Sequence, residues 1–437
     1  MNEHIPAAAA SIVLLGLALG LGAGAASAAS TAGTLDTTFG HNGIVLTNLG
    51  LDANGNQIQA VPGAVALQSN GDIVVTIGIG GPGSGLVRFL PNGTRDTSFG
   101  NGSFAALPDL GIPSVRPGLA VQADGKLVWA GEATASNGTG GAFAVVRFNA
   151  NGTLDQGFGA GGLATSAFAN STVQGAQTVL VQHDGKILAG GAALFGGRPP
   201  VDIGGLVRFN ANGSIDKGFG SGGQELVPNS NPVLSSVIGV ASLGLDASGD
   251  IFTLPSHLEF SPAGQPDATL TPAAITTASP STSGAVTFLP SGGFVVGTEV
   301  FTGRTGDPDV QVTRFNPDGS TASVGTGIDY AGQNGALAVK DVPAAVAIQA
   351  NGQAVIGGTH TESGQFSSTS VFGLARVNAD GTLDPAFGTR GVLTTRIQGN
   401  DFASLLVIQP DGKILAVGTS QNAAGVLDLA LARYLSQ

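Results

Sequence analysis

Residues 345–397 read AVAIQANGQAVIGGTHTESGQFSSTSVFGLARVNADGTLDPAFGTRGVLTTRI. This stretch contains four short runs rich in apolar and β-branched residues, which we name strands A (345–349), B (354–360), C (372–378) and D (391–397). The pairs Asn351-Gly352 and Asp380-Gly381 separate A from B and C from D. Such pairs are favoured where both central residues of a tight turn need a positive φ, so we expect antiparallel hairpins.

The same pattern recurs along the chain. Seven copies of the A-to-B turn are marked by Gly71, Gly125, Gly185, Gly249, Gly292, Gly352 and Gly412, with successive spacings of 54, 60, 64, 43, 60 and 60 residues. Four-stranded antiparallel units repeated at a fixed period are typical of the blades of a β-propeller. The sequence therefore predicts an all-β fold, a seven-bladed propeller.

The two termini carry complementary parts of one repeat. The last copy stops within strand C at residues 431–437, and the missing turn and strand D stand at residues 33–40 and 43–47. An open solenoid would instead need polar caps at its ends. We expect residues 33–47 to complete the last blade, so that no strand edge is left unpaired. If the D strands are outermost, the A strands lie around the central channel. The whole ring is expected to form one domain spanning residues 29–437.

The repeated phrases DGKILxxG and RFNxxGTLDxxFGxxG resemble the delta-60 repeat family over residues 33–437. Members of that family are bacterial exported proteins that are usually assigned a β-propeller of unknown function. The resemblance implies the fold and export, and it implies no catalytic residue.

Three residue types recur at fixed positions of the repeat, and we interpret them as structural because a group that repeats from blade to blade serves to hold the blades together. They are arginines in strand C, acids after it and phenylalanines in the following turn: Arg88, Arg147, Arg208, Arg314, Arg376 and Arg433; Asp36, Asp96, Asp155, Asp216 and Asp384; Phe39, Phe99, Phe158, Phe219 and Phe387. The fourth blade has Glu259 in the arginine position, and the fifth has Val324 in place of phenylalanine. These departures fit sequence drift, an interface or a specialised binding edge.

Composition excludes several classes of function. The chain of 437 residues has 71 glycines, a net charge of −12 and no cysteine. Nucleic acid is not expected as a partner, because the few basic residues form no cluster that could neutralise phosphates. Without cysteine there are no disulfides, thiolate metal sites, thiol nucleophiles or lipid-anchored lipoprotein cysteine.

The N-terminus points to export. Residues 5–29 are apolar and small, and they end in Ala26-Ser27-Ala28, which fits a signal peptide cleaved after residue 28. The preceding residues include Glu3 and His4 and no basic residue, so an uncleaved anchor is the alternative. We expect a monomer that is secreted, periplasmic or at the cell surface, with no membrane span after cleavage.

The variable B-to-C and D-to-A loops are where a site is expected, because binding residues concentrate on loops held by a rigid scaffold. The polar candidates there are Glu132, Asp307, Asp309, His360 and Glu362. His360 and Glu362 alternate on one strand and share a face, so they could form an acid/base or metal pair if a third partner exists. A solvated loop pair is the alternative.

No cofactor is predicted, although one segment partly matches a calcium loop. Asp52, Asn54 and Asn56 take the spacing of its first three ligands, but position twelve is Gly63 and not the expected glutamate. A divalent cation such as calcium therefore has weak support in the sequence.

Two functions fit these observations. The first is a non-catalytic binding or surface-interaction scaffold for an extracellular glycan, protein or small ligand. The alternative is an extracellular hydrolase or lyase that acts on a polymer at the variable loops, through His360, Glu362, Asp307 and Asp309. Propeller folds host both kinds of function, so the fold does not choose between them.

Overall fold

The computed structural model describes residues 32–50, 60–78, 84–111, 117–134, 141–195, 201–228, 239–240, 242–246, 248–254, 258–267, 285–289, 291–301, 308–331, 339–363 and 368–437. The predicted signal peptide and the partial calcium loop at residues 52–56 lie outside them. Within these ranges, no helix is long and apolar enough to cross a bilayer.

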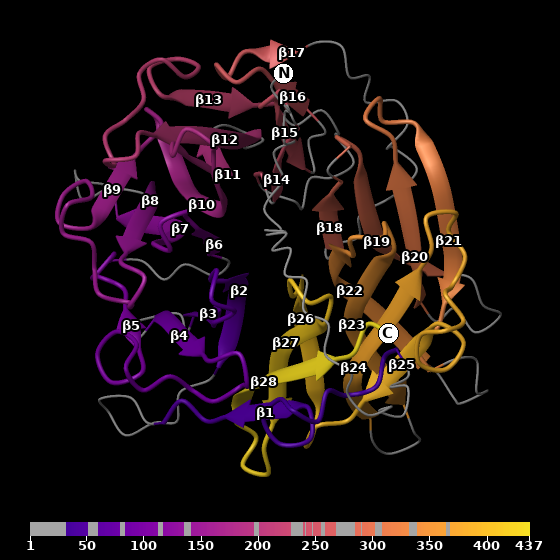
Figure 1. Ribbon diagram of the computed structural model, residues 1–437. Helices are drawn as coiled ribbons and strands as arrows, with labels where there is room; N and C mark the ends of the chain where they lie inside the picture. Colours follow the sequence, from indigo (N-terminus) through magenta and orange to yellow (C-terminus); the bar gives the residue numbers. More distant parts are fainter. Residues whose placement is uncertain are drawn as a thin grey trace, which may run out of the picture.

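The structure confirms the seven-bladed propeller: the described strands form seven four-stranded antiparallel sheets around a ring (Figure 1). The first four blades are β2 (Val61–Leu67), β3 (Ile73–Gly78), β4 (Gly85–Phe89) and β5 (Ala105–Ala106); β6 (Gly118–Val121), β7 (Leu127–Thr134), β8 (Gly141–Phe148) and β9 (Leu163–Ser166); β10 (Ser171–Val181), β11 (Ile187–Phe195), β12 (Val201–Phe209) and β13 (Gln224–Val227); β14 (Ser242–Leu245), β15 (Ile251–Leu254), β16 (Leu258–Phe260) and β17 (Pro266–Asp267). The other three are β18 (Ala285–Phe288), β19 (Phe294–Phe301), β20 (Pro308–Phe315) and β21 (Thr321–Ile328); β22 (Val339–Ile348), β23 (Ala354–Ser363), β24 (Ser368–Val377) and β25 (Val392–Thr395); and β26 (Asp401–Ile408), β27 (Ile414–Gln421), β28 (Leu427–Tyr434) and β1 (Ile44–Thr47).

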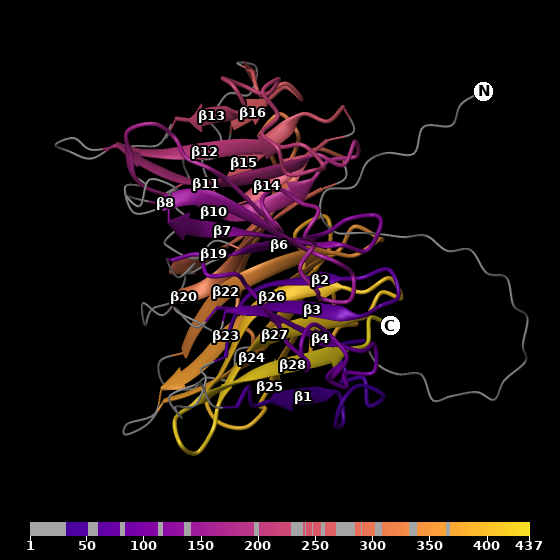
Figure 2. The same ribbon diagram turned by 90° about the vertical axis from the view of Figure 1, so that its left-hand side faces the viewer.

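The first strand of every blade faces the channel, and each contacts the first strand of the next blade (Figure 1). Because the strands alternate in direction, the A-to-B and C-to-D turns lie on one side of the ring, which we call the turn face. The other connections lie on the opposite side, the loop face. The turn face is the one seen in Figure 1, and Figure 2 shows the ring from the side.

The N-terminal segment closes the ring, as predicted. Strand β1 pairs with β28 from Ile44↔Ala432 to Thr47↔Leu429, and the two strands are adjacent in Figures 1 and 2. The backbone N–H of Gly33 also donates to the carbonyl of Leu435 at 2.8 Å. β1 therefore supplies the outermost strand of the seventh blade.

The A-to-B turns differ from the prediction in one respect. Among the described residues, the glycine of each turn has a positive φ, for example +87° at Gly71, but the preceding asparagine or aspartate does not. The turns are therefore three-residue loops that end in a left-handed glycine. The preceding side chain instead accepts a hydrogen bond from the backbone N–H two residues later, as Asn70 does from Asp72 at 3.1 Å.

The repeated arginine, acid and phenylalanine form one contact unit, which we call the arginine clasp. In five clasps the arginine Nε donates to the Oδ2 of the acid at 2.8–2.9 Å, in the pairs Arg88–Asp96, Arg147–Asp155, Arg208–Asp216, Arg376–Asp384 and Arg433–Asp36. Each guanidinium also lies 4.4–4.8 Å from the centre of a fully buried phenylalanine ring: Phe99, Phe158, Phe219, Phe387 and Phe39, respectively. Full burial of such a ring contributes on the order of 2 kcal/mol.

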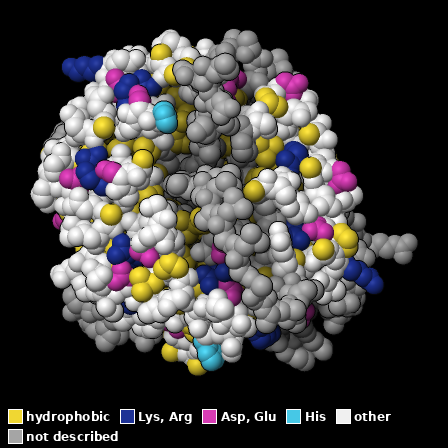
Figure 3. Space-filling model, viewed as in Figure 1, with side chains coloured by type: hydrophobic (Ala, Val, Ile, Leu, Met, Phe, Trp, Pro, Cys, Tyr) yellow, Lys and Arg dark blue, Asp and Glu magenta, His cyan; other side chains and the backbone are white. Residues whose placement is uncertain are grey.

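The clasp also joins neighbouring blades. The Nη1 of Arg88 donates to the carbonyl of Ala150 in the next blade at 2.7 Å, and Arg376 donates to Ser436 at 2.6 Å. Across the ring closure, Arg433 in the seventh blade donates to Pro91 in the first at 2.5 Å. Basic and acidic side chains accordingly stand in groups around the ring in Figure 3.

Blades four and five interrupt this series. Glu259, in the arginine position of blade four, lies opposite Asp267 in the strand register. Arg314 in blade five still donates to a carbonyl of the next blade, that of Gly352 at 2.6 Å, but the described residues give it no acid partner. Val324, in place of the phenylalanine, is 45% exposed. These two blades therefore lack the complete clasp.

Deleting residues 33–47 is expected to lower the melting temperature strongly and to promote association. The deletion removes β1 and Asp36, so β28 would present an open strand edge. Thermal melting and light scattering of the shortened and parent proteins test this. Equal melting curves would contradict closure of the ring by this segment.

The substitution Asp36→Asn is expected to destabilise the fold by about 3 kcal/mol, because it leaves buried Arg433 without its acid. Urea unfolding of the variant and the parent measures this change. Asp411→Asn is the control: Asp411 also pairs with Lys413, at 2.9 Å, but its side chain is 53% exposed. Exposed pairs contribute little, so the control should change stability by less than about 1 kcal/mol.

The Asp36 clasp also predicts an acid transition. Burial raises the pKa of Asp36, but hydrogen bonds from Thr38 and the charges of Arg433 and Lys413 lower it from 3.8 to about 2. A pKa lower in the folded state gives stability that is present above the unfolded pKa and lost as the pH falls through the folded one. The stability advantage of the parent over Asp36→Asn should therefore shrink between about pH 4 and 2, as measured by urea unfolding. A constant difference over that window would be the contrary result.

Candidate functional site

The most buried polar pair of blade six lies near the loop face. Asp341 on β22 and His360 on β23 are opposite each other in the strand register, and the Nδ1 of His360 is 2.7 Å from an Oδ1 oxygen of Asp341. Asp341 is 0% exposed and His360 is 1% exposed. Asp341 lies before the predicted strand A, because β22 extends further toward the loop face than predicted, whereas His360 is the last residue of the predicted strand B.

Part of this arrangement recurs in blade seven and is structural. In blade seven, Asp401 and Ser420 take the same register positions, and the Ser420 hydroxyl contacts Asp401 at 2.5 Å. Asp401 also accepts the backbone N–H of Ile397 at 2.7 Å, as Asp341 accepts that of Tyr330 at 3.2 Å. These carboxylates hold the connection that enters their own blade.

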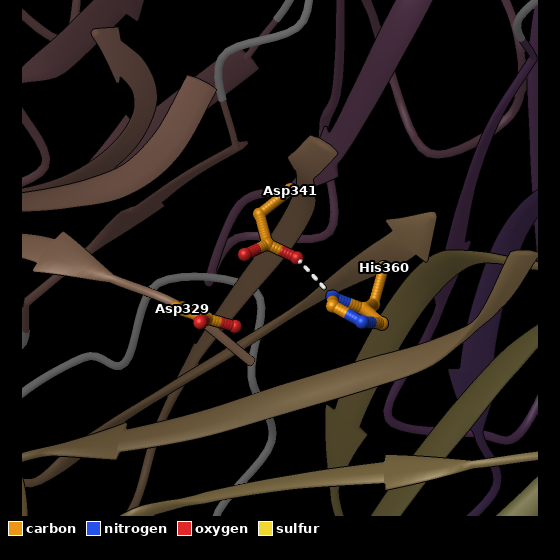
Figure 4. Close-up of side chains that lie close together, drawn as sticks. All are labelled: Asp329, Asp341 and His360. Atoms are coloured by element: carbon orange, nitrogen blue, oxygen red, sulfur yellow. Dashed lines mark hydrogen bonds and ion pairs between the residues drawn. The ribbon is translucent and has the colours of Figure 1, made fainter. Parts of the chain in front are cut away.

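Two features of blade six are not repeated. His360 stands at the position that Ser420 takes in blade seven, although the hydroxyl of a serine is enough to hold the loop. Asp329 directly precedes Tyr330, whose backbone N–H Asp341 accepts, whereas Arg396 precedes the equivalent Ile397 in blade seven. The side chains of Asp329, Asp341 and His360 converge in Figure 4, and their potential metal-ligand atoms lie within 4.8 Å of one another. We call these three residues the blade-six cluster.

The electrostatics of the cluster favour a bound positive charge. Burial raises the pKa of Asp341, and the nearby charge of Asp329 raises it further, against the opposing effect of His360. Burial lowers the pKa of His360, but the hydrogen bond and charge of Asp341 offset this and raise it overall. The pair therefore holds a proton more strongly than either group does in water.

One buried polar atom of the cluster, Nε2 of His360, has no hydrogen-bond partner among the described residues. Such atoms are uncommon in proteins, because an unpaired buried group loses its hydration without compensation. Glu362 Oε1 lies 3.6 Å from Nε2, which is too far for a hydrogen bond, and its side chain is 60% exposed. The imidazole therefore has spare coordination capacity.

Of the four sequence candidates that lie within the described residues, the structure brings His360 and Glu362 together. Glu132 lies half-buried on β7 in blade two, and burial raises its pKa. Asp309 lies half-buried on β20 in blade five. Asp307 is outside the described residues.

Sequence reasoning missed Asp329 and Asp341. Asp341 precedes His360 by 19 residues, as Asp401 precedes Ser420, so alignment of whole repeats could have found it. Asp329 has no counterpart in blade seven, and no repeat pattern points to it.

A second acidic group lies in blade four. Potential ligand atoms of Asp246, Asp250 and Glu259 lie within 4.8 Å of one another. Glu259 stands where other blades have the clasp arginine. All three residues are partly exposed, and Asp246 accepts backbone hydrogen bonds from Ser248 and Asp250 within its turn.

Comparison with known families adds one finding. Segments 68–99, 122–158, 182–219, 349–387 and 409–437 match the family described as "Domain of unknown function (DUF5122) beta-propeller". Five repeats are thus similar to a propeller family without a known function. The segments contain four complete arginine clasps, and none of them lies in blades four and five. No curated protein matches the chain.

Solved structures give distant similarity only. A Dyadobacter fermentans protein of unknown function has 13% identity and a TM-score of 0.44, and the match covers 90% of this chain and 100% of that one. A gluconolactonase of Xanthomonas campestris has 13% identity, a TM-score of 0.38 and 89% coverage of both chains. An α-L-arabinanase of Penicillium chrysogenum has 11% identity, a TM-score of 0.35 and coverage of 94% and 99%. These values leave function open.

Proposed function

We propose that the protein is an exported, non-catalytic propeller that binds an extracellular glycan, protein or small ligand at the loop face of blade six. The main support is the distribution of polar residues. The repeated charged residues are used in clasps on the turn face, whereas the unrepeated polar residues Asp329, His360 and Glu362 gather near the loop face. A repeated scaffold that carries an unrepeated polar group near its loop face is what a binding module needs.

A catalytic function has less support. General acid/base catalysis requires the reacting nitrogen to reach the substrate. Nε2 of His360 is buried, so the imidazole does not present it to a molecule on the surface. Glu362 is the exposed member of the group and suits recognition of a polar ligand.

Ligand binding can be tested with fluorescently labelled protein on intact bacterial cells and on a glycan array. We expect saturable binding by the parent and at least about tenfold weaker binding by Glu362→Gln, the order of loss when a charged hydrogen bond is removed. Asp184→Asn is a matched control, because Asp184 is 55% exposed and lies in a turn on the turn face.

Three other outcomes decide against parts of the proposal. No saturable binding on either surface counts against the binding function. Equal binding by Glu362→Gln and the parent would show that the ligand does not bind at Glu362 of blade six. Polymer hydrolysis that disappears in His360→Ala and Glu362→Ala, but not in Asp184→Asn, supports the enzyme instead.

The support for export is the apolar stretch at residues 5–29, which ends in the small residues Ala26-Ser27-Ala28. Cell fractionation followed by intact-mass measurement should recover the chain outside the cytoplasm without its first 28 residues. Recovery of the uncleaved chain in the membrane fraction would favour the anchor alternative.

A further inference from the structure

We propose that Asp329, Asp341 and His360 form a binding site for a divalent transition-metal ion, with Zn²⁺ as the representative ion. This inference is independent of the proposed function, because the ion can bind whether or not a ligand occupies the loop face. It concerns residues different from the partial calcium loop at Asp52, Asn54 and Asn56.

The spacing of the three side chains fits one ion. Zn²⁺ binds imidazole nitrogen and carboxylate oxygen at 2.0–2.2 Å, so ligand atoms on one ion stand about 3 to 4.4 Å apart. The ligand atoms of the cluster lie within 4.8 Å of one another, and Nδ1 of His360 is 2.7 Å from the nearer oxygen of Asp341. Small side-chain movements, which separate this pair and bring Asp329 closer, would place all three groups around one ion. Figure 4 shows that they come from two adjacent strands and the residue that follows β21.

The imidazole supplies the second observation. His360 is 1% exposed, and its Nδ1 lies 2.7 Å from Asp341, on the side of the ring that faces both carboxylates (Figure 4). Its Nε2 lies on the other side of the ring, 3.6 Å from Glu362. Nδ1 is therefore the nitrogen that would bind the ion together with Asp329 and Asp341, and binding would release the proton that Nδ1 shares with Asp341.

The charges of the cluster agree with a cation. Two carboxylates lie beside one imidazole, and Asp341 is fully buried. An ion of charge +2 would offset the repulsion between Asp329 and Asp341. The donor set also indicates the class of metal, since imidazole suits zinc and its neighbours, whereas Ca²⁺ and Mg²⁺ prefer oxygen ligands alone.

The equivalent position in blade seven shows that loop clamping does not explain the cluster. There, Asp401 and Ser420 hold the connection with a carboxylate and a hydroxyl, and Arg396 stands at the Asp329 position. An arginine there would repel a cation. Blade six thus differs from its neighbour at two positions, and both differences add a metal ligand.

The experiment uses the full chain, expressed without a histidine tag and treated with EDTA. Titration with Zn²⁺ in a calorimeter should give one ion per chain, and bound Zn²⁺ should raise the melting temperature. Mg²⁺ and Ca²⁺ should give no comparable binding. Co²⁺ should produce visible absorption bands of a protein-bound ion.

The substitutions His360→Gln and Asp329→Asn should each weaken Zn²⁺ binding by about tenfold or more. His183→Gln is the control, because His183 is exposed in a turn on the turn face, and it should bind like the parent. Circular dichroism checks folding. If His360→Gln does not fold, partly exposed Asp329→Asn decides the outcome.

The proposal is overturned if the parent shows no saturable Zn²⁺ binding. It is also overturned if Asp329→Asn, correctly folded, binds Zn²⁺ with unchanged affinity. Preferential binding of Ca²⁺ would overturn the assignment to a transition metal.

Discussion

The arginine clasp is the interaction on which this ring depends. One guanidinium pairs with an acid of its own blade, stacks on a buried phenylalanine and donates to a carbonyl of the next blade. Three of the five lysines reach the same acids, at 3.2 to 3.3 Å. The clasp therefore uses much of the small supply of positive charge, which explains why a chain with so few basic residues keeps them at fixed repeat positions.

The fold could be predicted because its determinants are local and repeated. Glycine turns define hairpins, and seven copies define blades, so errors in one copy do not alter the result. The complementary halves at the two ends then defined the closure. The prediction of the turn type was wrong, because Asn-Gly pairs suit both two-residue and three-residue loops. The sequence alone does not determine the sign of φ at the residue before the glycine.

The candidate site could be predicted only in part, for the opposite reason. His360 and Glu362 are two residues apart on one strand, so alternation put them together. Asp341 lies across the hairpin, and its pairing with His360 depends on how far β22 extends beyond the predicted strand A. Asp329 comes from the end of the preceding blade, and only the packing of two blades brings it to His360. A site that occurs once on a repeated scaffold consists of residues that deviate from the repeat, and the periodicity of the sequence does not show which of them lie together.

Closure by β1 also sets the order of events during biosynthesis. Asp36 and its partner Arg433 are 397 residues apart, so β1 is made long before the strand with which it pairs. At about 5–20 residues per second, synthesis of the intervening chain takes roughly 20 to 80 s. During that interval β1 has no partner strand, because β28 has not yet been made. Closure of the ring, and the cooperativity that it brings, therefore depends on the pairing of β1 with β28.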